Sequence, residues 1–398
     1  MTGPLSDIRV LDAATFLAAP FCGTMLADFG AEVIKVEQPG AGDSLRRFGT
    51  MTDCGDTYVW MSEARNKSSV TIDLRKPDGA ELFRDLVRHS DVVLENFRPG
   101  TMARWGLGYE DLRKINPKLI LLSISAYGQD GPYKDMPGFA RVAHAFSGLA
   151  YLSGEPGRPP VVPGSTSLAD YMSGMFGAIG VLIGLRDAER SGQGQWIDLG
   201  LYESMFRVLD ELAPKYAATG FQRERMGADT VNVVPHSHYE TADANWVALA
   251  CSNDRMWQRL CRAMERTDLI DDPAYATMIE RDRHRPVVNA LVAGWVGGLP
   301  LEVVLERTRA EEVPCAKLLS IADIFQDPQY AARGNLVEID DPRLGKLTLP
   351  APLPRMSRTP PSLRSAGPAL GDANARIFGD LLGLTSERLA GLKTKGVI

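Results

Sequence analysis

Hydrophobic and polar positions along the first 200 residues follow the pattern of strands separated by helices. Short apolar runs predict strands at Ile8–Leu11, Glu32–Glu37, Ser69–Leu74, Asp91–Leu94, Leu119–Ser125 and Trp196–Leu201. Apolar residues at helical spacing predict helices at Phe21–Phe29, Asp78–His89 and Asp170–Arg186. Strands that alternate with helices indicate βαβ units around a mostly parallel sheet.

The pattern changes after about residue 222. A strand is predicted at Val247–Cys251, amphipathic helices at Asp254–Met264 and Val287–Val296, and a helical tail at Ala373–Leu392 after the proline-rich connector Pro350–Pro361. We therefore expect an α/β fold, with a Rossmann-like large domain built from both chain ends and a smaller α+β domain. The expected division is 1–224 for the N-terminal part of the large domain, 225–335 for the small domain, and 336–398 for a linker and the return to the large domain.

Composition is that of an ordinary globular chain, with 44% hydrophobic and 24% charged residues among 398. The formal net charge of −6 excludes a wide nucleic-acid surface and leaves anion binding to a local basic pocket. Phe176–Leu185 is apolar but glycine-broken and short for a membrane span, and no signal peptide precedes it. The five cysteines form no CxxC pair. These features predict a soluble, cytoplasmic protein with reduced thiols.

Familiar motifs are missing from the sequence. The turn after Glu37 has Gly40 and Gly42 but not the third glycine of a dinucleotide fingerprint, and there is no Walker A, GxSxG or HExxH sequence. His236 and His238 form an HxH pair, but no acidic third ligand stands at a recognisable spacing. We therefore predict no metal site, and assign these histidines to structural or substrate-contacting roles.

Asp170 follows the polar loop Pro163–Ala169 and opens the long apolar helix. A carboxylate in this place can simply cap the helix. The same backbone N–H groups and helix dipole favour an anion, and would keep a nucleophilic carboxylate ionised. Local pattern alone leaves both roles open.

Seven segments, in order and nearly spanning the chain, resemble the family III CoA-transferases, which include formyl-CoA transferase, carnitine CoA-transferase and the α-methylacyl-CoA racemases. They are Val10–Glu37, Asn66–Gly79, Glu95–Leu112, Ile115–Tyr133, Ser167–Leu185, Ser191–Ser204 and Gly367–Leu384. The resemblance implies an interlocked dimer, either a homodimer or a heteromer with a paralogous subunit. It also implies that coenzyme A is part of substrate and product, with no tightly bound cofactor.

The resemblance places the nucleophilic aspartate at Asp170. The implied CoA contacts are Phe16, Leu17, Ala18, Ile72, Asp73, Leu74, Arg75, Asn96, Phe97 and Arg104. Arg75 and Arg104 can bind phosphate through paired hydrogen bonds. The Phe97 ring can pack on adenine or on the pantetheine arm, and the Asn96 side chain can form a hydrogen bond with an amide of CoA. The family mechanism runs through an aspartyl anhydride and an aspartyl-CoA thioester, with backbone N–H groups near Phe16–Ala18 and at Asp170 as candidate oxyanion donors.

The sequence departs from relatives that use formate and oxalate. Leu17 stands in place of a glutamine, Ala140 in place of an acidic residue, and 226–241 lacks the glycine-rich loop. Phe139 stands where the racemases have a histidine, and phenylalanine cannot move a proton, so transfer is favoured over racemisation. A racemase or epimerase, and a subunit of a heteromeric transferase, are the alternatives.

Positively charged or titratable residues suggest the class of acid. Lys134, Arg141, His144, His236 and His238 can each meet a second carboxylate, although a structural salt bridge is the ordinary alternative for Arg141. We therefore expect succinyl-CoA as donor and a dicarboxylate such as malate, benzylsuccinate or another substituted succinate as acceptor.

Overall fold

The computed structural model describes residues 3–398, and the chain divides into two compact units. Unit 1 contains 1–149, 162–214 and 332–398, and unit 2 contains 150–161 and 215–331. The expected small domain, 225–335, therefore begins too late and omits the segment 150–161. That segment belongs to unit 2 because Arg225 donates a hydrogen bond to Tyr151 O at 2.7 Å and Gly227 N donates one to Gly154 O at 2.9 Å.

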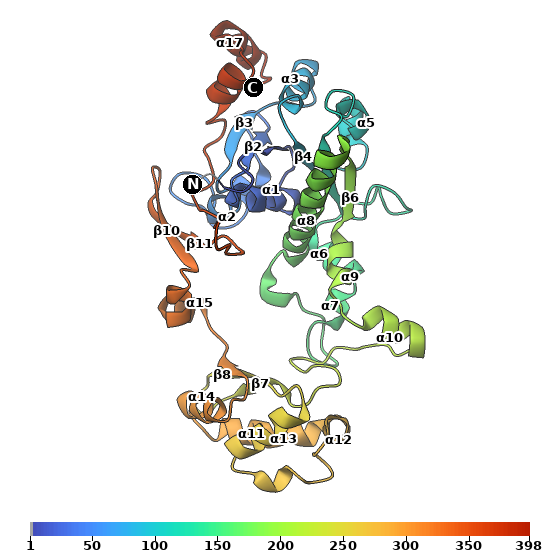
Figure 1. Cartoon of the computed structure of the whole chain (residues 1–398), viewed down its shortest axis with the longest axis vertical. Helices are drawn as coiled ribbons and strands as arrows, with labels where there is room; N and C mark the ends of the chain where they lie inside the picture. Colours follow the sequence, from blue (N-terminus) through green and yellow to red (C-terminus); the bar gives the residue numbers. More distant parts are fainter. Residues whose placement is uncertain (1–2) are drawn as a thin grey trace. The chain divides into compact units, whose positions relative to one another are not determined.

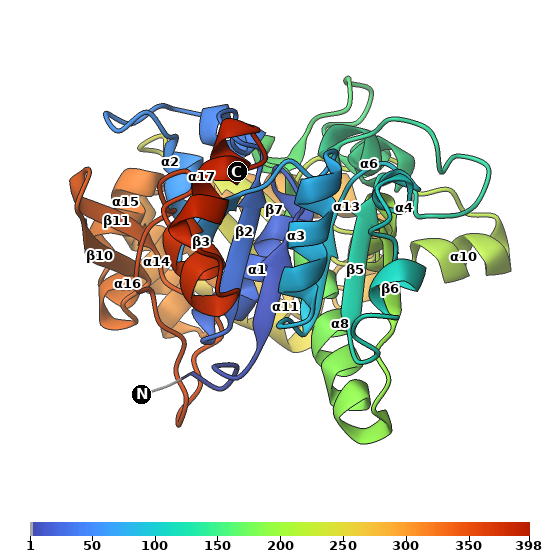
Figure 2. The ribbon, with the colours of Figure 1, turned by 90° about the horizontal axis from the view of Figure 1, so that it is seen from above.

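Unit 1 is built on a parallel six-stranded sheet (Figures 1 and 2) with the order β3-β2-β1-β4-β5-β6. The strands are β1 (Arg9–Asp12), β2 (Glu32–Glu37), β3 (Ser68–Thr71), β4 (Val92–Glu95), β5 (Ile120–Ser125) and β6 (Trp196–Gly200). All six coincide with predicted strands to within a few residues. This order is that of doubly wound nucleotide-binding folds, in which ligands bind at the carboxyl ends of the strands.

Helices cover both faces of the sheet, as the alternation of side chains along each strand requires. Leu11, Ile34 and Val93 point into a core that they share with α3 (Pro77–Val87) and the C-terminal segment, whereas Val10 and Val33 pack against α1 (Ala18–Asp28) and α8 (Leu168–Ser191). The remaining helices of this unit include α2 (Tyr58–Glu63), α4 (Thr101–Arg104), α5 (Tyr109–Leu112), α6 (Ala140–Phe146) and α9 (Leu201–Arg207). α7 (Leu149–Leu152) and α10 (Leu212–Thr219) lie where the chain passes between units.

α8 is long and apolar enough to cross a membrane by length and composition alone. This composition fits a helix that packs in the core of unit 1, where its glycines allow close approach to neighbouring elements. A Cβ at Gly174 would lie 2.7 Å from Ala18 O, and one at Gly177 would lie 2.7 Å from the Leu122 side chain. α8 is therefore held against α1 and β5, and its first turn is fixed at the sheet edge where β1 ends.

The C-terminal part of unit 1 contains a hairpin where a linker was expected. Strands β10 (Leu336–Asp341) and β11 (Gly345–Pro350) pair antiparallel, and Leu347 and Leu349 pack with Trp60 and Met61. The predicted helical tail is divided into a π-helical segment at Ala375–Leu381 and α17 (Ser386–Thr394).

Unit 2 has a three-stranded antiparallel sheet of β7 (His236–Glu240), β8 (Trp246–Ala250) and β9 (Cys315–Lys317). Only β8 was predicted, because the neighbouring strands carry few apolar residues. Its helices are α11 (Asp254–Ala263), α12 (Met278–Arg283), α13 (Arg285–Gly297), α14 (Leu301–Ala310), α15 (Ile321–Gln326) and α16 (Pro328–Ala332). Val247, Leu249, Trp257 and Val292 belong to its separate core.

Candidate active site

The loop that follows β1 is held by two side chains from distant parts of unit 1. Asn96, just after β4, accepts a hydrogen bond from Thr15 N at 2.7 Å and donates one to Thr15 O at 2.6 Å. Asp43 accepts a hydrogen bond from Phe16 N at 2.9 Å. These bonds keep Phe16 in the left-handed region, at a φ of 66°, which a bulky residue rarely adopts.

Asp43 is in turn fixed by buried charges. Lys35 lies 2.9 Å from it, and both Lys35 and Lys67 pair with Asp12. Burial would raise the pKa of Asp43, but Lys35 and the N–H groups of Leu45 and Phe16 hold it below its ordinary value. The loop at Thr15 and Phe16 therefore rests on an ionised carboxylate.

Asp170 is the third residue of α8 and is only 5% exposed. Burial raises the pKa of its carboxyl to about 7, and no cation among residues 3–398 offsets this effect. The expected stabilisation of the anion by the helix end is thus outweighed by desolvation. A buried carboxyl that ionises near neutrality, beside a cavity, is a candidate nucleophile.

His144, on α6, meets the first turn of α8. Its Nε2 accepts a hydrogen bond from Ala169 N at 3.0 Å, so in the neutral ring the proton is on Nδ1. Burial and the nearby Arg141 lower the pKa of His144, which keeps the ring neutral. Nδ1 is buried without a partner among residues 3–398.

A cavity of about 560 Å³ opens beside Asp170. Three aromatic residues form part of its wall: the Phe16 ring meets the Phe48 ring edge-on at 4.7 Å and approaches Phe139 at 6.4 Å. Arg141 and His144 line it from α6. The other lining residues are Thr15, Ser44, Ala140, Val162, Ser165, Thr166 and Ser167.

A second cavity, of about 150 Å³, shares Thr15 with the first cavity as a lining residue. Its wall contains five of the ten predicted CoA contacts, namely Ile72, Asp73, Leu74, Arg75 and Phe97. The Phe97 ring packs edge-on against Trp105 at 5.2 Å, and the partly exposed Arg75 pairs with Asp73 at 2.8 Å. An extended ligand that passes Thr15 would therefore join this cavity to Asp170.

Other predicted contacts lie apart from these two cavities. Leu17 and Ala18 are buried where α1 begins, and the exposed Arg104 donates a hydrogen bond to Thr101 at 2.8 Å. Lys134 is exposed and lines neither cavity. His236 and His238 line a cavity of about 580 Å³ in unit 2, together with Cys315.

The expected oxyanion donors also need revision. The amides of Thr15 and Phe16 are already bonded to Asn96 and Asp43, and Asp170 N bonds to Ser167 O. Along the described chain, Leu17 N, at the N-cap of α1, and Ala18 N and Ala19 N, in its first turn, have no hydrogen-bond partner. They are the remaining backbone candidates in this loop.

Reasoning from the sequence missed Thr15, Phe48 and the hydroxyl-bearing residues Ser165, Thr166 and Ser167. The only available signal was the concentration of small polar residues just before Asp170. It also missed Glu95, at the end of β4, whose pKa is raised by burial to about 7. This carboxyl lines a separate cavity of about 230 Å³.

The model of CoA-transferase family III matches residues 5–374, and the chain belongs to this family. It is a CoA-transferase. It is 51% identical, over 100% of its length and 98% of the relative's, to the succinyl-CoA–L-malate CoA-transferase beta subunit of Chloroflexus aurantiacus. It is 48% identical to the alpha subunit from Chloroflexus aurantiacus, over 99% of this chain and 92% of that one. A solved CaiB/BaiF family protein from Brucella suis is 33% identical, with a TM-score of 0.83 over 96% of this chain and 100% of that one.

Proposed function

We propose that the chain transfers CoA from succinyl-CoA to a hydroxylated dicarboxylic acid of the malate type, through covalent intermediates on Asp170. The observation that carries this proposal is that Asp170 shares a cavity with Arg141. Arg141 is exposed and has no ion-pair partner in the described part of the chain. The two Chloroflexus relatives, whose names specify succinyl-CoA and L-malate, support the same pair of substrates.

Arg141 is the residue that selects a diacid. One carboxylate of the acceptor must reach the reacting carbon on Asp170, so the second carboxylate needs a cation elsewhere in the cavity. Guanidinium binds carboxylate through two parallel hydrogen bonds, which suits an unpaired arginine at the cavity wall. Succinate and malate both carry this second carboxylate.

The reaction begins when the Asp170 carboxylate attacks the succinyl thioester carbonyl, which gives a mixed anhydride and releases CoA thiolate. The thiolate attacks the aspartyl carbonyl, which releases succinate and leaves an aspartyl-CoA thioester. The acceptor carboxylate then attacks this thioester carbonyl and again expels CoA thiolate. The thiolate finally attacks the acceptor acyl carbon of the new anhydride, which frees acyl-CoA and restores Asp170.

Trapping tests this route. The protein is incubated with succinyl-CoA, treated with hydroxylamine, and digested so that the aspartyl hydroxamate is located by peptide mass. We expect the modification at Asp170, and none in the Asp170→Asn variant. Asp340→Asn, at an exposed aspartate of β10 that lines neither cavity, is the matched carboxylate control and should still be modified at Asp170. Active transfer without modification at Asp170 would contradict the proposal.

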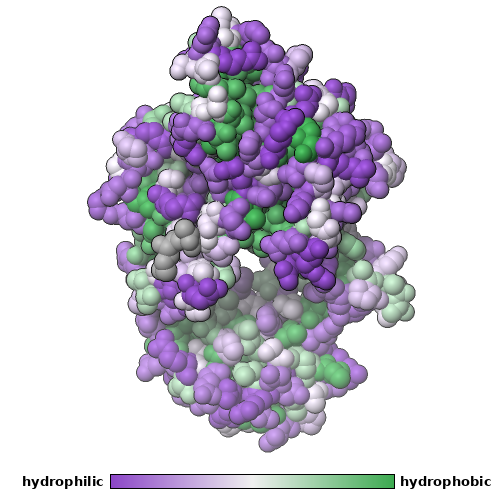
Figure 3. All heavy atoms as spheres, turned by 45° about the horizontal axis from the view of Figure 1, so that its top comes forward, coloured by the Kyte–Doolittle hydropathy of each residue, from purple (hydrophilic) through white to green (hydrophobic). Residues whose placement is uncertain are grey.

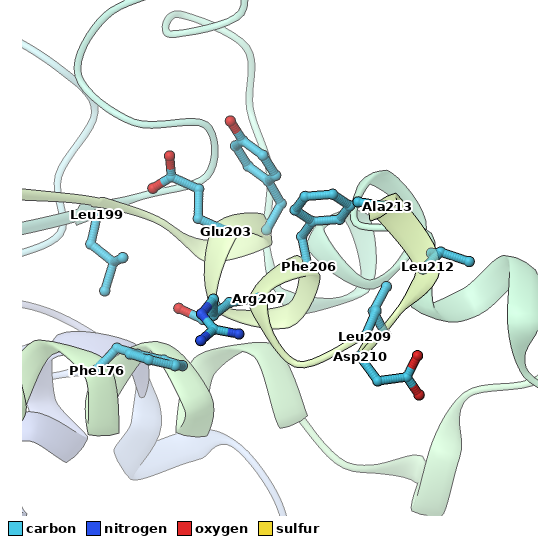
Figure 4. Close-up of a pocket in the computed structure, with 11 residues that line it drawn as sticks. Phe176, Leu199, Glu203, Phe206, Arg207, Leu209, Asp210, Leu212 and Ala213 are labelled. Carbon is cyan, nitrogen blue, oxygen red and sulfur yellow. The ribbon is translucent and has the colours of Figure 1, made fainter. Parts of the chain in front are cut away.

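The same proposal includes assembly with a second copy of this chain. Large apolar side chains are exposed on α8, where Ile183 is 63% exposed, and on α9 at Phe206. Figure 4 shows Phe206, Leu209 and Leu212 on one side and Phe176 of α8 on the other side of a cavity of about 640 Å³. Hydrophobic residues also reach the otherwise hydrophilic face drawn in Figure 3. Near-equal identity to the alpha and beta relatives favours one chain that serves both roles.

A further inference from the structure

The start of α8 is capped in an unusual way. Ser167 occupies the N-cap position, where a serine ordinarily accepts a hydrogen bond from the second or third N–H of the helix. Its side chain makes no such bond. The acceptor for Ala169 N is instead His144 Nε2, at 3.0 Å, which reaches across from α6.

Because His144 accepts the hydrogen bond from Ala169 N, the Ser167 hydroxyl is free to bind a ligand in the cavity. Ser165 and Thr166 line the same cavity, and none of the three hydroxyls has a hydrogen-bond partner within the described residues. Three adjacent hydroxyl-bearing residues thus line the same cavity as Arg141 and Asp170. A hydroxyl both donates and accepts, so such a row matches a neutral hydroxyl group better than a second carboxylate.

We propose that Ser165, Thr166 and Ser167 form a hydroxyl-recognition site for the 2-hydroxyl group of the acceptor acid. This inference rests on the proposed function, in which Arg141 binds the distal carboxylate and Asp170 carries the reacting one. An acceptor that lacks the hydroxyl leaves these three groups without the partner that the hydroxylated acid supplies. Because Ser165 and Thr166 are exposed to solvent, the expected preference for the hydroxylated acid is that of one or two net hydrogen bonds.

Malate and succinate differ only in this hydroxyl, so their ratio is the direct readout. Transfer from succinyl-CoA to L-malate is compared with exchange of isotope-labelled succinate into succinyl-CoA, as kcat/KM for each acceptor. The variant carries Ser165→Ala, Thr166→Val and Ser167→Ala together. We expect the malate-to-succinate ratio to fall about tenfold, as for the loss of one or two hydrogen bonds. The exposed Ser357→Ala is the matched control and should leave the ratio unchanged.

The outcomes distinguish failure of the hydroxyl-recognition site from failure of the proposed CoA-transferase function. A ratio that changes by less than about threefold in the triple variant, where tenfold corresponds to 1.4 kcal/mol, overturns the hydroxyl site. If the triple variant loses both activities, the three single variants are compared, and an unchanged ratio in all of them also overturns it. Wild-type protein that supports neither malate transfer nor succinate exchange would instead refute the proposed function.

Discussion

At the scale of single residues, the ionisation of Asp170 should control the rate. Its pKa is raised by burial to about 7, and only the ionised carboxylate can attack a thioester. We therefore expect kcat/KM for succinyl-CoA to rise about tenfold per pH unit below pH 7 and to level off above it. The measurement is a pH profile of kcat/KM between about pH 5 and pH 9.

Glu95 provides the control for this profile, because burial raises its pKa to about 7 as well. Glu95→Gln should retain the rise if Asp170 is the titrating group. If the rise is lost in that variant, Glu95 and not Asp170 is the group whose ionisation limits the rate. A profile already flat at pH 6 would contradict both assignments.

Asp170 should also make stability depend on pH. Its folded-state pKa lies above the unfolded value of about 4, so the folded state is favoured below pH 4 and loses this advantage as pH rises through about 7. Asp170→Asn should therefore gain about 1–3 kcal/mol relative to wild type between pH 4 and pH 8. The measurement is the difference in thermal midpoint at the two pH values, which cancels the constant effect of the amide.

Asp43→Asn is expected to behave in the opposite sense. Because Lys35 and two backbone N–H groups lower the folded-state pKa of Asp43, its stabilisation is present above the unfolded pKa and lost as pH falls. This variant should therefore lose stability relative to wild type as pH rises from about 3 to 7. If the stability of both variants relative to wild type changes with pH in the same direction, the two carboxyls do not have the opposite pKa shifts described for them.

At the scale of elements, a hydrogen bond from the start of α8 to a side chain of α6 adds to the apolar packing of Ala140 and Ala143 in the shared core. His144 acts as a positioning residue, since its Nε2 holds Ala169 N one residue before Asp170. His144→Gln keeps an acceptor, whereas His144→Phe removes it and leaves an N–H group unpaired. We expect the Phe variant to lose about 1 kcal/mol, as for a missing helix cap, together with most of its activity.

The conservative variant makes this prediction specific. His144→Gln should recover most of the thermal midpoint and of kcat. It should also leave the rise of kcat/KM towards pH 7 in place, because that rise is assigned to Asp170 and not to His144. If the Gln and Phe variants are equally impaired, the ring itself rather than the cap is what the site requires.

At the scale of the whole molecule, the periodic pattern of apolar residues predicted the strands and helices well. Contacts between side chains distant in the sequence could not be predicted from it. The six parallel strands follow from apolar runs, and the position of Asp170 follows from a helix that begins after a polar loop. Membership of segment 150–161 in unit 2 could not be predicted, because it depends on bonds between Tyr151, Gly154 and residues some 70 positions later. The same holds for Asn96 and His144, whose amide and imidazole form hydrogen bonds with the backbone of residues far away in the sequence.

The exposed apolar face of α8 leads to a prediction about assembly. Ile179, Leu182 and Ile183 are all exposed on this helix, whereas Gly174 and Gly177 are buried against α1 and β5. Burying a large aliphatic side chain yields about 1.5–3 kcal/mol, so a second chain that covers this face gains several such contributions. Light scattering coupled to size exclusion should therefore find the wild-type chain associated when it is expressed alone.

Ile183→Glu places a charge on that face and should shift the chain towards monomer at micromolar concentration, because the charge would have to be desolvated in the contact. Ile279→Glu, an equally exposed isoleucine on α12, is the matched control and should leave the mass unchanged. If the wild-type chain is a monomer that associates only when a paralogous chain is added, the partner is a paralogue and not a second copy of this chain. If Ile183→Glu alters neither mass nor concentration dependence, the contact lies elsewhere on the chain.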